Sequence, residues 1–164
     1  MAAQQSDTPA PLQLDHYLPY LINRAGVSLA MRFSATLRQA GITLQDWRVL
    51  AALREKNGQR LTELAQRTSI EVSTLSRLVG GLETAGMVSR GRDSDDARAI
   101  AIRLTPAGEA ATATLTPAAQ QLEGVAVAGL SAAEIAQLKV LLERIYANLA
   151  EMPAADDSAA DTAK

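Results

Sequence analysis

The chain has 164 residues, which is enough for one domain with a hydrophobic core and without disulfides or metal ions to stabilise it. It contains no cysteine, which excludes disulfides, thiolate metal sites and catalytic thiols, and its single histidine, His16, cannot hold zinc alone, so we expect no metal and no cofactor. The formal net charge is -2, yet 13 Lys and Arg stand against 8 Asp and Glu between Arg24 and Arg103, an excess that permits contact with nucleic acid.

No segment has the composition of a membrane-spanning or exported sequence. The first residues lack a positive patch followed by an apolar run, and no stretch approaches the roughly 20 apolar residues that span a bilayer. We therefore expect a cytoplasmic protein without membrane contact. Residues 1–13 and 151–164 are rich in small and polar residues, and we expect both to be disordered tails.

The segment after the first tail predicts a long helix. Apolar residues recur at three- and four-residue steps over 14–33, and the helix is expected to end near residue 40. Pro19 lies in its first two turns, where it either kinks the helix or delays its start. A second helix is expected to begin at Thr43 or the next residue and to stop at 57–58, because Asn-Gly breaks helices.

Two shorter helices joined by a tight turn are predicted next. The first runs from about Leu61 to Arg67, and the second starts near Val72 or Ser73. Their apolar positions, with a small residue where the helices cross, form the skeleton of a helix-turn-helix: Leu61, Leu64, Ala65, Ile70, Leu75, Leu78 and Leu82.

The outward side chains of the second of these helices are polar. They are Ser73, Thr74, Ser76 and Arg77, whose hydroxyl and guanidinium groups can meet base edges and phosphates in a major groove. Arg77 is the first candidate for a base contact. The alternative is that these residues cap and solvate an ordinary helix pair.

A β-hairpin is predicted directly after this helix, with strands at 87–90 and 99–104. Its arginines are Arg90, Arg92 and Arg98, and such a hairpin can place an arginine in the adjacent minor groove. Arg98 is the best candidate, because Asp96 stands two residues away and can orient its guanidinium by a hydrogen bond. The alternative is a merely solvated hairpin tip.

Two further helices are predicted after the hairpin. Thr105 and the following proline have the character of a helix start, and Pro117 either breaks or kinks the alanine-rich segment that follows. Ser131 is expected to be the N-cap of the last helix, with Glu134 in capping-box register. The fold class is mainly α with a small β-hairpin, in a single domain over 14–150.

Four segments carry a more specific pattern. They are GITLQDWRVL at 41–50, LTELA at 61–65, STLSRLV at 73–79, and a hairpin block at 93–108 in which an Asp-x-Arg tip leads into Leu-Thr-x-x-Gly. Together they resemble the MarR family of winged helix-turn-helix transcriptional regulators. The sequence differs from the family pattern at Ala97, where many relatives carry a second arginine, and at 80–81, where two glycines replace a polar pair.

The resemblance covers about residues 14–150 and implies both an architecture and a function. Residues 42–104 would form the winged helix lobe, with Asp96 and Arg98 in the wing, and residues 14–41 and 105–150 would form dimerisation helices. The implied function is a ligand-responsive repressor that binds pseudo-palindromic duplex DNA as a homodimer and is released by a small aromatic or phenolic carboxylate.

A candidate ligand site lies on the first predicted helix, where His16, Tyr20 and Arg24 are spaced to share one face. Arg24 would pair with a carboxylate, His16 or Tyr20 would hydrogen-bond a ring substituent, and Phe33 or Trp47 would pack on the ring. The alternative reading gives Arg24 an ion pair between subunits and places Trp47 in the core.

Two other functional classes compete with a DNA-binding regulator. The sequence contains no arrangement of nucleophile, base and orienting residue and no glycine-rich phosphate loop, so we expect no enzyme. A winged helix that binds a protein instead of DNA is the remaining alternative, and it would have no salt-dependent affinity for a duplex.

Overall fold

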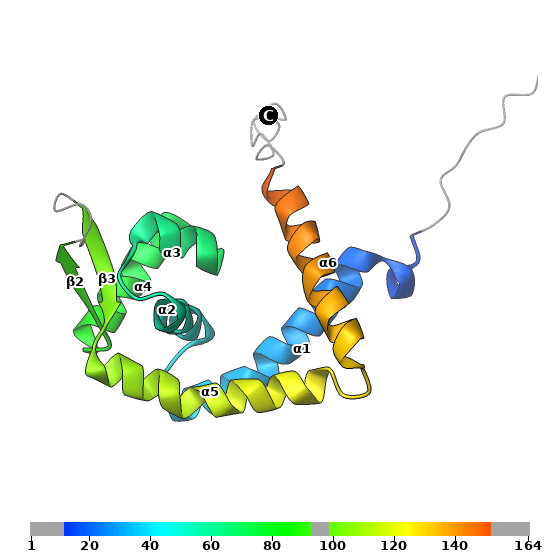
Figure 1. Ribbon diagram of the computed structural model, residues 1–164, viewed down its shortest axis with the longest axis horizontal. Helices are drawn as coiled ribbons and strands as arrows, with labels where there is room; N and C mark the ends of the chain where they lie inside the picture. The colour runs from blue at the N-terminus through cyan, green and yellow to red at the C-terminus, as the bar shows by residue number, and fades with distance from the viewer. Residues whose placement is uncertain (1–11, 93–98, 152–164) are drawn as a thin grey trace, which may run out of the picture. The chain divides into compact units, whose positions relative to one another are not determined.

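The computed structural model describes residues 12–92 and 99–151 (Figure 1). In chain order the elements are the 3-10 turn η1 (Leu14–His16), α1 (Leu18–Gln39), α2 (Leu44–Glu55), β1 (Gln59–Arg60), α3 (Leu61–Thr68), α4 (Val72–Thr84), β2 (Val88–Arg92), β3 (Ile100–Leu104), α5 (Pro106–Ala126) and α6 (Ala132–Ala150). This order confirms the mainly helical fold with a hairpin after the fourth helix. The chain divides into two compact units, and the boundary between them in the sequence falls between Glu123 and Gly124.

The starts of the first two helices follow from local chemistry. Helix α1 begins at Leu18, and Pro19 occupies its first turn, where a missing N–H removes no helical hydrogen bond. Of the two predicted effects of Pro19, the structure therefore has the delayed start. Helix α2 begins with a capping box in which the Asp46 N–H donates to the Thr43 hydroxyl (3.1 Å) and the Thr43 N–H donates to the Asp46 carboxylate (3.0 Å).

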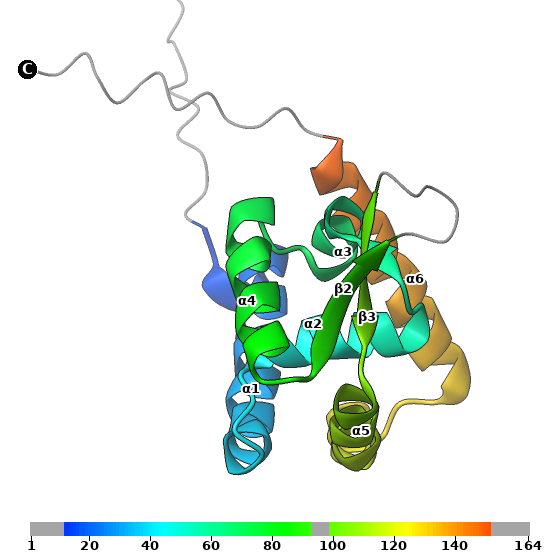
Figure 2. The same ribbon diagram turned by 90° about the vertical axis from the view of Figure 1, so that its left-hand side faces the viewer.

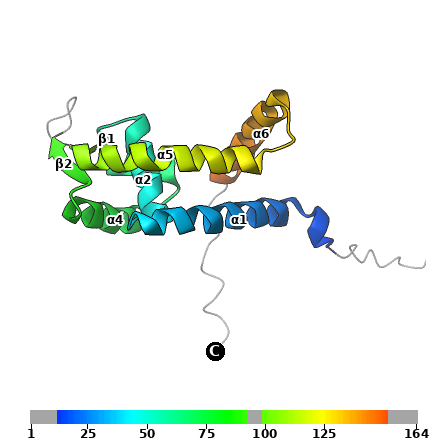
Figure 3. The same ribbon diagram turned by 90° about the horizontal axis from the view of Figure 1, so that it is seen from below.

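Helices α2, α3 and α4 surround the core of the first unit. Its fully buried side chains, with no more than 2% of their surface exposed, include Leu37, Val49, Leu50, Leu53, Leu64, Leu75, Val79 and Ile102. Figure 3 shows α2 lying between α5 and α4. Ser69 follows α3 with a left-handed backbone (φ 53°), and the chain turns there into α4.

The hairpin belongs to a three-stranded antiparallel sheet in the order β1-β3-β2. Val88 lies opposite Leu104 and Arg92 opposite Ile100. The two-residue strand β1 was not predicted. The buried Gln59 amide holds β1 to the end of α2, because it donates to the carbonyls of Ala52 (2.8 Å) and Lys56 (2.6 Å).

The junction between the hairpin and α5 explains the Leu-Thr-x-x-Gly pattern. The side chain of Leu104 is buried in the core, and the Thr105 hydroxyl donates to the Gly86 carbonyl (2.6 Å) while it accepts from the Gly108 N–H (3.2 Å). A Cβ atom at Gly108 would lie 2.1 Å from the carbonyl oxygen of Met87. Only glycine allows α5 to approach the backbone this closely.

The last two helices were predicted with one exception. Helix α5 continues through Pro117, which neither breaks it nor ends it. Helix α6 begins at the predicted capping box, with the Ser131 hydroxyl accepting from the Glu134 N–H (3.3 Å) and the Ser131 N–H donating to the Glu134 carboxylate (2.7 Å). The hydrogen bonds from Ser131 lower the pKa of Glu134.

Large apolar side chains stay exposed on α6 and α1. Those of α6, with 41 to 60% of their surface exposed, are Leu138, Val140, Leu141, Leu142, Tyr146 and Leu149. No residue of α6, which the structure describes over its whole length, is buried. Exposed apolar residues of α1 are Leu18, Ile22, Val27, Leu29 and Met31. None of the helices in the described part of the chain is long and apolar enough to cross a membrane.

Candidate nucleic-acid interface

Helix α4 has one apolar and one polar face. Leu75, Val79 and Leu82 are buried against the core, because a helix turns about 100° per residue and brings these positions to one side. The predicted contact residues lie on the other side: Ser73, Ser76 and Arg77 are exposed, and Thr74 is half-buried. Figure 2 shows α4 and the β2–β3 hairpin side by side in the same unit.

The first turn of α4 is organised by Glu71, a residue that was not predicted to belong to the site. Its carboxylate accepts hydrogen bonds from the N–H groups of Ser73 (2.9 Å) and Thr74 (3.0 Å) and from the Ser73 hydroxyl. Sequence rules favour Ser, Thr, Asp or Asn at an N-cap, so glutamate gave no signal.

The same hydrogen bonds set the ionisation of Glu71. The Ser73 hydroxyl and the two backbone N–H groups, with a smaller contribution from the charge of Arg77, lower the pKa of Glu71 to about 2. Because the pKa is lowered on folding, this cap contributes fully above the ordinary carboxyl pKa of 4.5 and is lost as the pH falls through about 2. Glu71 is therefore ionised at neutral pH.

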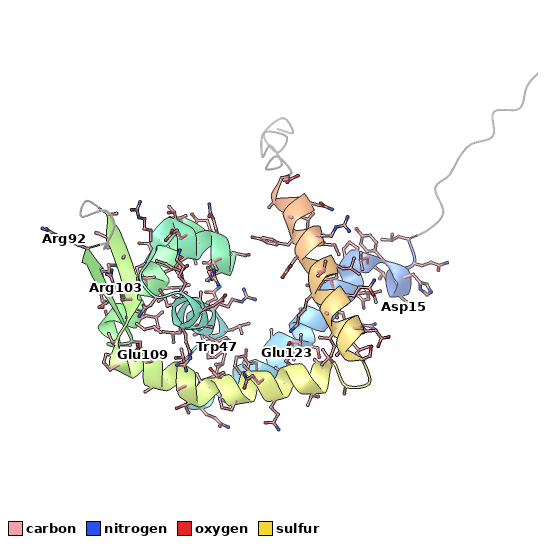
Figure 4. All side chains as sticks on the ribbon, viewed as in Figure 1. Asp15, Trp47, Arg92, Arg103, Glu109 and Glu123 are labelled. Carbon is pink, nitrogen blue, oxygen red and sulfur yellow. The ribbon has the colours of Figure 1, made fainter. Side chains whose placement is uncertain are left out.

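The described wing arginines differ in their partners. Arg90 forms an ion pair with Glu83 (3.1 Å) and donates to the Ser76 carbonyl (3.3 Å), which ties the hairpin to α4. Arg92 is exposed at the end of β2, and Figure 4 shows its side chain extending away from the unit. Asp96 and Arg98 lie outside the described residues.

Arg103 on β3 is a second residue that was not predicted. Its guanidinium donates to the carbonyl of Arg92 (3.1 Å), across the hairpin. Added Cβ atoms would lie 3.3 Å from its Nη1 at Gly91 and 3.4 Å from its Nε at Gly58, so both glycines leave room for it. Arg103 thus braces the base of the wing from the neighbouring strand. The signal was available in the alternation of β3, where Ile100, Ile102 and Leu104 share the opposite face.

The two glycines late in α4 have no steric explanation among residues 12–92 and 99–151. Cβ atoms added at Gly80 and Gly81 would meet nothing within 4 Å. Each glycine in a helix costs about 1 kcal/mol relative to alanine. The exposed polar side chains in the second half of α4 are Glu83, whose carboxylate pairs with Arg90, and Thr84.

The five predicted ligand residues fall into two groups. His16 lies in η1 outside α1, so the helical spacing that joined it to Tyr20 and Arg24 was wrong for His16. Arg24 lies over the Tyr20 ring (5.7 Å to its centroid) and 3.9 Å from the Asp15 carboxylate, within the same chain. Arg24 and Phe33 are nine positions apart, which is about 14 Å along a helix.

The second group belongs to the core. Phe33 is buried, and its ring meets that of Trp47 edge to face with centroids 5.3 Å apart. The expected alternative for Trp47, a place at the core, is thus what the structure has. Figure 4 marks Trp47 on α2.

An open pocket of about 340 Å³ lies beside Trp47, between α2 and α3. It is lined by Trp47, Arg48, Ala51, Ala52, Glu55, Arg67 and Thr68. Glu55 and Arg67 form an ion pair across it, and the hydrogen bond and charge of Arg67 lower the pKa of Glu55. Arg48 adds a further positive charge to the lining.

Two helices joined by a tight turn and followed directly by a β-hairpin define a winged helix-turn-helix. The family model described as MarR family matches residues 40–99, which include α2 to β2 and end just before β3. The HTH-type transcriptional repressor Rv2887 of Mycobacterium tuberculosis is 28% identical over 131 residues, covering 80% of this chain and 94% of the relative.

Solved structures agree with this match. A MarR family transcriptional regulator from Silicibacter pomeroyi superposes with a TM-score of 0.75 at 28% identity, covering 88% of this chain and 95% of that one. BpsR of Bordetella bronchiseptica, whose DNA binding is regulated by 6-hydroxynicotinic acid, has a TM-score of 0.74 at 25% identity over 84% of this chain and 98% of its own. The chain is thus similar to transcriptional regulators of the MarR family, both in the matched segment and in its fold.

Proposed function

We propose that this chain is a ligand-responsive transcriptional repressor that binds pseudo-palindromic duplex DNA as a homodimer. The observation that carries the proposal is the exposed polar face of α4, with Ser73, Ser76 and Arg77, beside the hairpin of the same unit. A helix of this kind fits the major groove, and a hairpin next to it reaches the adjacent minor groove. A repressor among the relatives and the DNA-binding BpsR support the proposal.

Some of the proposed residues would contact the DNA, and one would position the hairpin that carries these contacts. Ser73, Thr74, Ser76 and Arg77 would meet base edges and phosphates, and Arg92, with Arg98 and its partner Asp96 as predicted, would enter the minor groove. Arg90 would act mainly by fixing the hairpin to α4 through Glu83. The contacts of Arg90 would then fix the distance between α4 and the hairpin, so that one subunit reaches two adjacent grooves.

The homodimer is proposed from the exposed apolar surface of α1 and α6. Each of the two helices exposes several large apolar side chains, and such side chains commonly mark a surface that another protein covers. A second copy of the chain would cover these side chains and place two α4 helices about 34 Å apart, one turn of the duplex. The division into a winged lobe over 42–104 and dimerisation helices over 14–41 and 105–150 is part of this proposal.

We propose a small aromatic carboxylate as the effector, and the pocket beside Trp47 as its site. The pocket has the size for such a ligand, the indole can pack on a ring, and Arg48 and Arg67 can bind a carboxylate. The regulation of BpsR by 6-hydroxynicotinic acid supports this class of ligand. Binding at Arg67 would compete with Glu55 and so act on the contact between α2 and α3.

The Arg77→Ala variant tests the DNA-binding proposal. On a duplex selected for tight binding by the wild type, the variant should lose about 1 to 3 kcal/mol of binding free energy. It should also discriminate less between base sequences, because a guanidinium that meets a base edge is removed. Fluorescence anisotropy with labelled duplexes at several salt concentrations measures both effects. Arg32→Ala removes the same charge from an exposed position of α1 and serves as the control.

The outcome also separates the two functional classes. DNA binding predicts affinity that falls steeply with salt, because bound cations are released from the duplex. A module that binds protein would have no affinity for any duplex. Equal discrimination between operator and random duplex by Arg77→Ala and the wild type would remove Arg77 from the reading surface.

Isothermal titration with 6-hydroxynicotinic acid tests the effector proposal. Arg67→Ala should weaken binding about tenfold, because a charge-assisted hydrogen bond to the carboxylate is lost. Arg24→Ala is the matched control on α1. Loss of binding in Arg24→Ala with unchanged binding in Arg67→Ala would instead place the ligand beside Tyr20, as the residue spacing predicted.

A further inference from the structure

We propose that Glu71 determines part of the operator sequence: it holds the hydroxyl hydrogen of Ser73, so that Ser73 can only accept a hydrogen bond and reads an amino group of adenine or cytosine in the major groove. The inference rests on the proposed DNA binding and adds to it a residue that does not itself touch a base. Glu71 is thus a positioning residue, and Ser73 is the residue that makes the contact.

Three hydrogen bonds hold the Glu71 carboxylate and the Ser73 hydroxyl in place. One carboxylate oxygen of Glu71 accepts from the Ser73 N–H (2.9 Å), and the other accepts from the Thr74 N–H (3.0 Å) and from the Ser73 hydroxyl. The carboxylate is therefore attached to α4 at three points, two of them on the backbone. It cannot turn away from Ser73 without uncapping the helix.

The direction of the hydroxyl bond follows from the chemistry of the two groups. An ionised carboxylate has no hydrogen to give, so the hydrogen between the two oxygens comes from Ser73. A serine hydroxyl has one hydrogen and two lone pairs, and most exposed hydroxyls rotate to donate or accept as needed. In this protein the hydrogen of Ser73 is already used, and the oxygen presents lone pairs only.

The bases differ in what they offer to such an oxygen. In the major groove adenine and cytosine present amino donors, whereas thymine O4 and guanine O6 and N7 are acceptors. An acceptor facing Ser73 would bring lone pairs together without a hydrogen. Ser73 therefore favours A or C at the base it meets and disfavours G or T.

The position of Ser73 suits a base contact. It is exposed and lies in the first turn of α4, the part of a recognition helix that meets base edges. Free N–H groups at a helix start can bind an anion, and a DNA phosphate could otherwise occupy that place. The Glu71 carboxylate already fills it and repels phosphate, which leaves the base edges as partners for this turn.

The experiment selects duplexes from a randomised library with the wild-type protein, Ser73→Ala and Glu71→Ser. Glu71→Ser keeps a favoured N-cap residue, so the helix is retained, but it has no carboxylate to hold the Ser73 hydrogen. Thermal unfolding and circular dichroism verify that all variants are folded. The readout is the base preference at each operator position, measured again on individual duplexes.

We expect one position in each half-site where the wild type prefers A or C by about tenfold over other bases. Ser73→Ala should lose that preference and no other. Glu71→Ser should accept all four bases there, because the freed hydroxyl can donate as well, and should bind random duplex more tightly because a negative charge is gone. A duplex lacking the amino group at that base should bind the wild type about tenfold more weakly and Ser73→Ala unchanged.

Three results would overturn the inference: a preference for G or T at the position sensitive to Ser73→Ala, no position sensitive to Ser73→Ala, or a full A or C preference retained by Glu71→Ser. Any of these leaves the proposed function standing if Arg77→Ala still relaxes preference elsewhere in the operator. If the wild type enriches no sequence and binds no duplex, the proposed DNA binding fails and the inference fails with it.

Discussion

Gly108→Ala should lower the free energy of unfolding by about 3 kcal/mol or more. The added methyl group would lie 2.1 Å from the Met87 carbonyl oxygen, and 3.0 Å from a methyl group of Leu104. Backbone cannot move aside as a side chain can, so α5 and the start of the hairpin must separate. The Thr105 bonds to Gly86 and Gly108, which close the same junction, would be strained together.

Urea unfolding measures this effect, and the same helix offers the control. Gly124→Ala adds the same methyl group to α5 at a position where it meets nothing within 4 Å, and it should stabilise the protein by up to about 1 kcal/mol. Equal midpoints for Gly108→Ala and the wild type would show that α5 does not cross the hairpin at this distance.

The double variant Leu138→Glu/Leu142→Glu should turn the proposed dimer into monomers and weaken operator binding at least a hundredfold. The two side chains are one helical turn apart and share a face of α6, with 42 and 41% of their surface exposed in the protomer. In the proposed dimer they are covered, and burying two carboxylates among apolar groups costs several kcal/mol. Losing the dimer also removes the second recognition helix from the same duplex.

Light scattering gives the mass, and duplex titration gives the affinity. Gln137→Glu adds a carboxylate to the same helix at an exposed polar position and should leave both unchanged. A double variant that remains dimeric at micromolar concentration would place the interface elsewhere. A wild type that is monomeric under the same conditions would contradict the proposed homodimer itself.

The helices could be predicted from the sequence because their signals are local. Thr43, Ser131 and Pro19 act on residues within one turn, and the capping box at Ser131 and Glu134 was confirmed atom by atom. Helix α5 shows the opposite case, since Pro117 is a local signal for a break and yet the helix continues. Packing of Leu115, Ala118 and Ala119 against the core offsets the lost hydrogen bond.

The candidate site was predicted in part. The polar residues of α4 were found because the buried Leu75 and Leu82 fix which face points outward. Glu71 was not found, because its carboxylate caps the N–H groups at the start of α4, and glutamate is not among the residues that N-caps usually favour. The ligand residues were joined by a helical spacing that fails at His16, where Pro19 keeps the helix from reaching.

The sequence by itself determined where the helices after the first one begin, which helix faces are apolar, and that a hairpin follows the second helix of a helix-turn-helix. Periodicity and capping act over a few residues, and a single chain displays them directly. Only the tertiary structure decided that Arg90 ties the wing to α4, that Arg103 braces it, and that Gly108 must lack a side chain. These contacts join residues 7 to 21 positions apart in the sequence, and their distances are set by how the strands and helices pack, which no local pattern records.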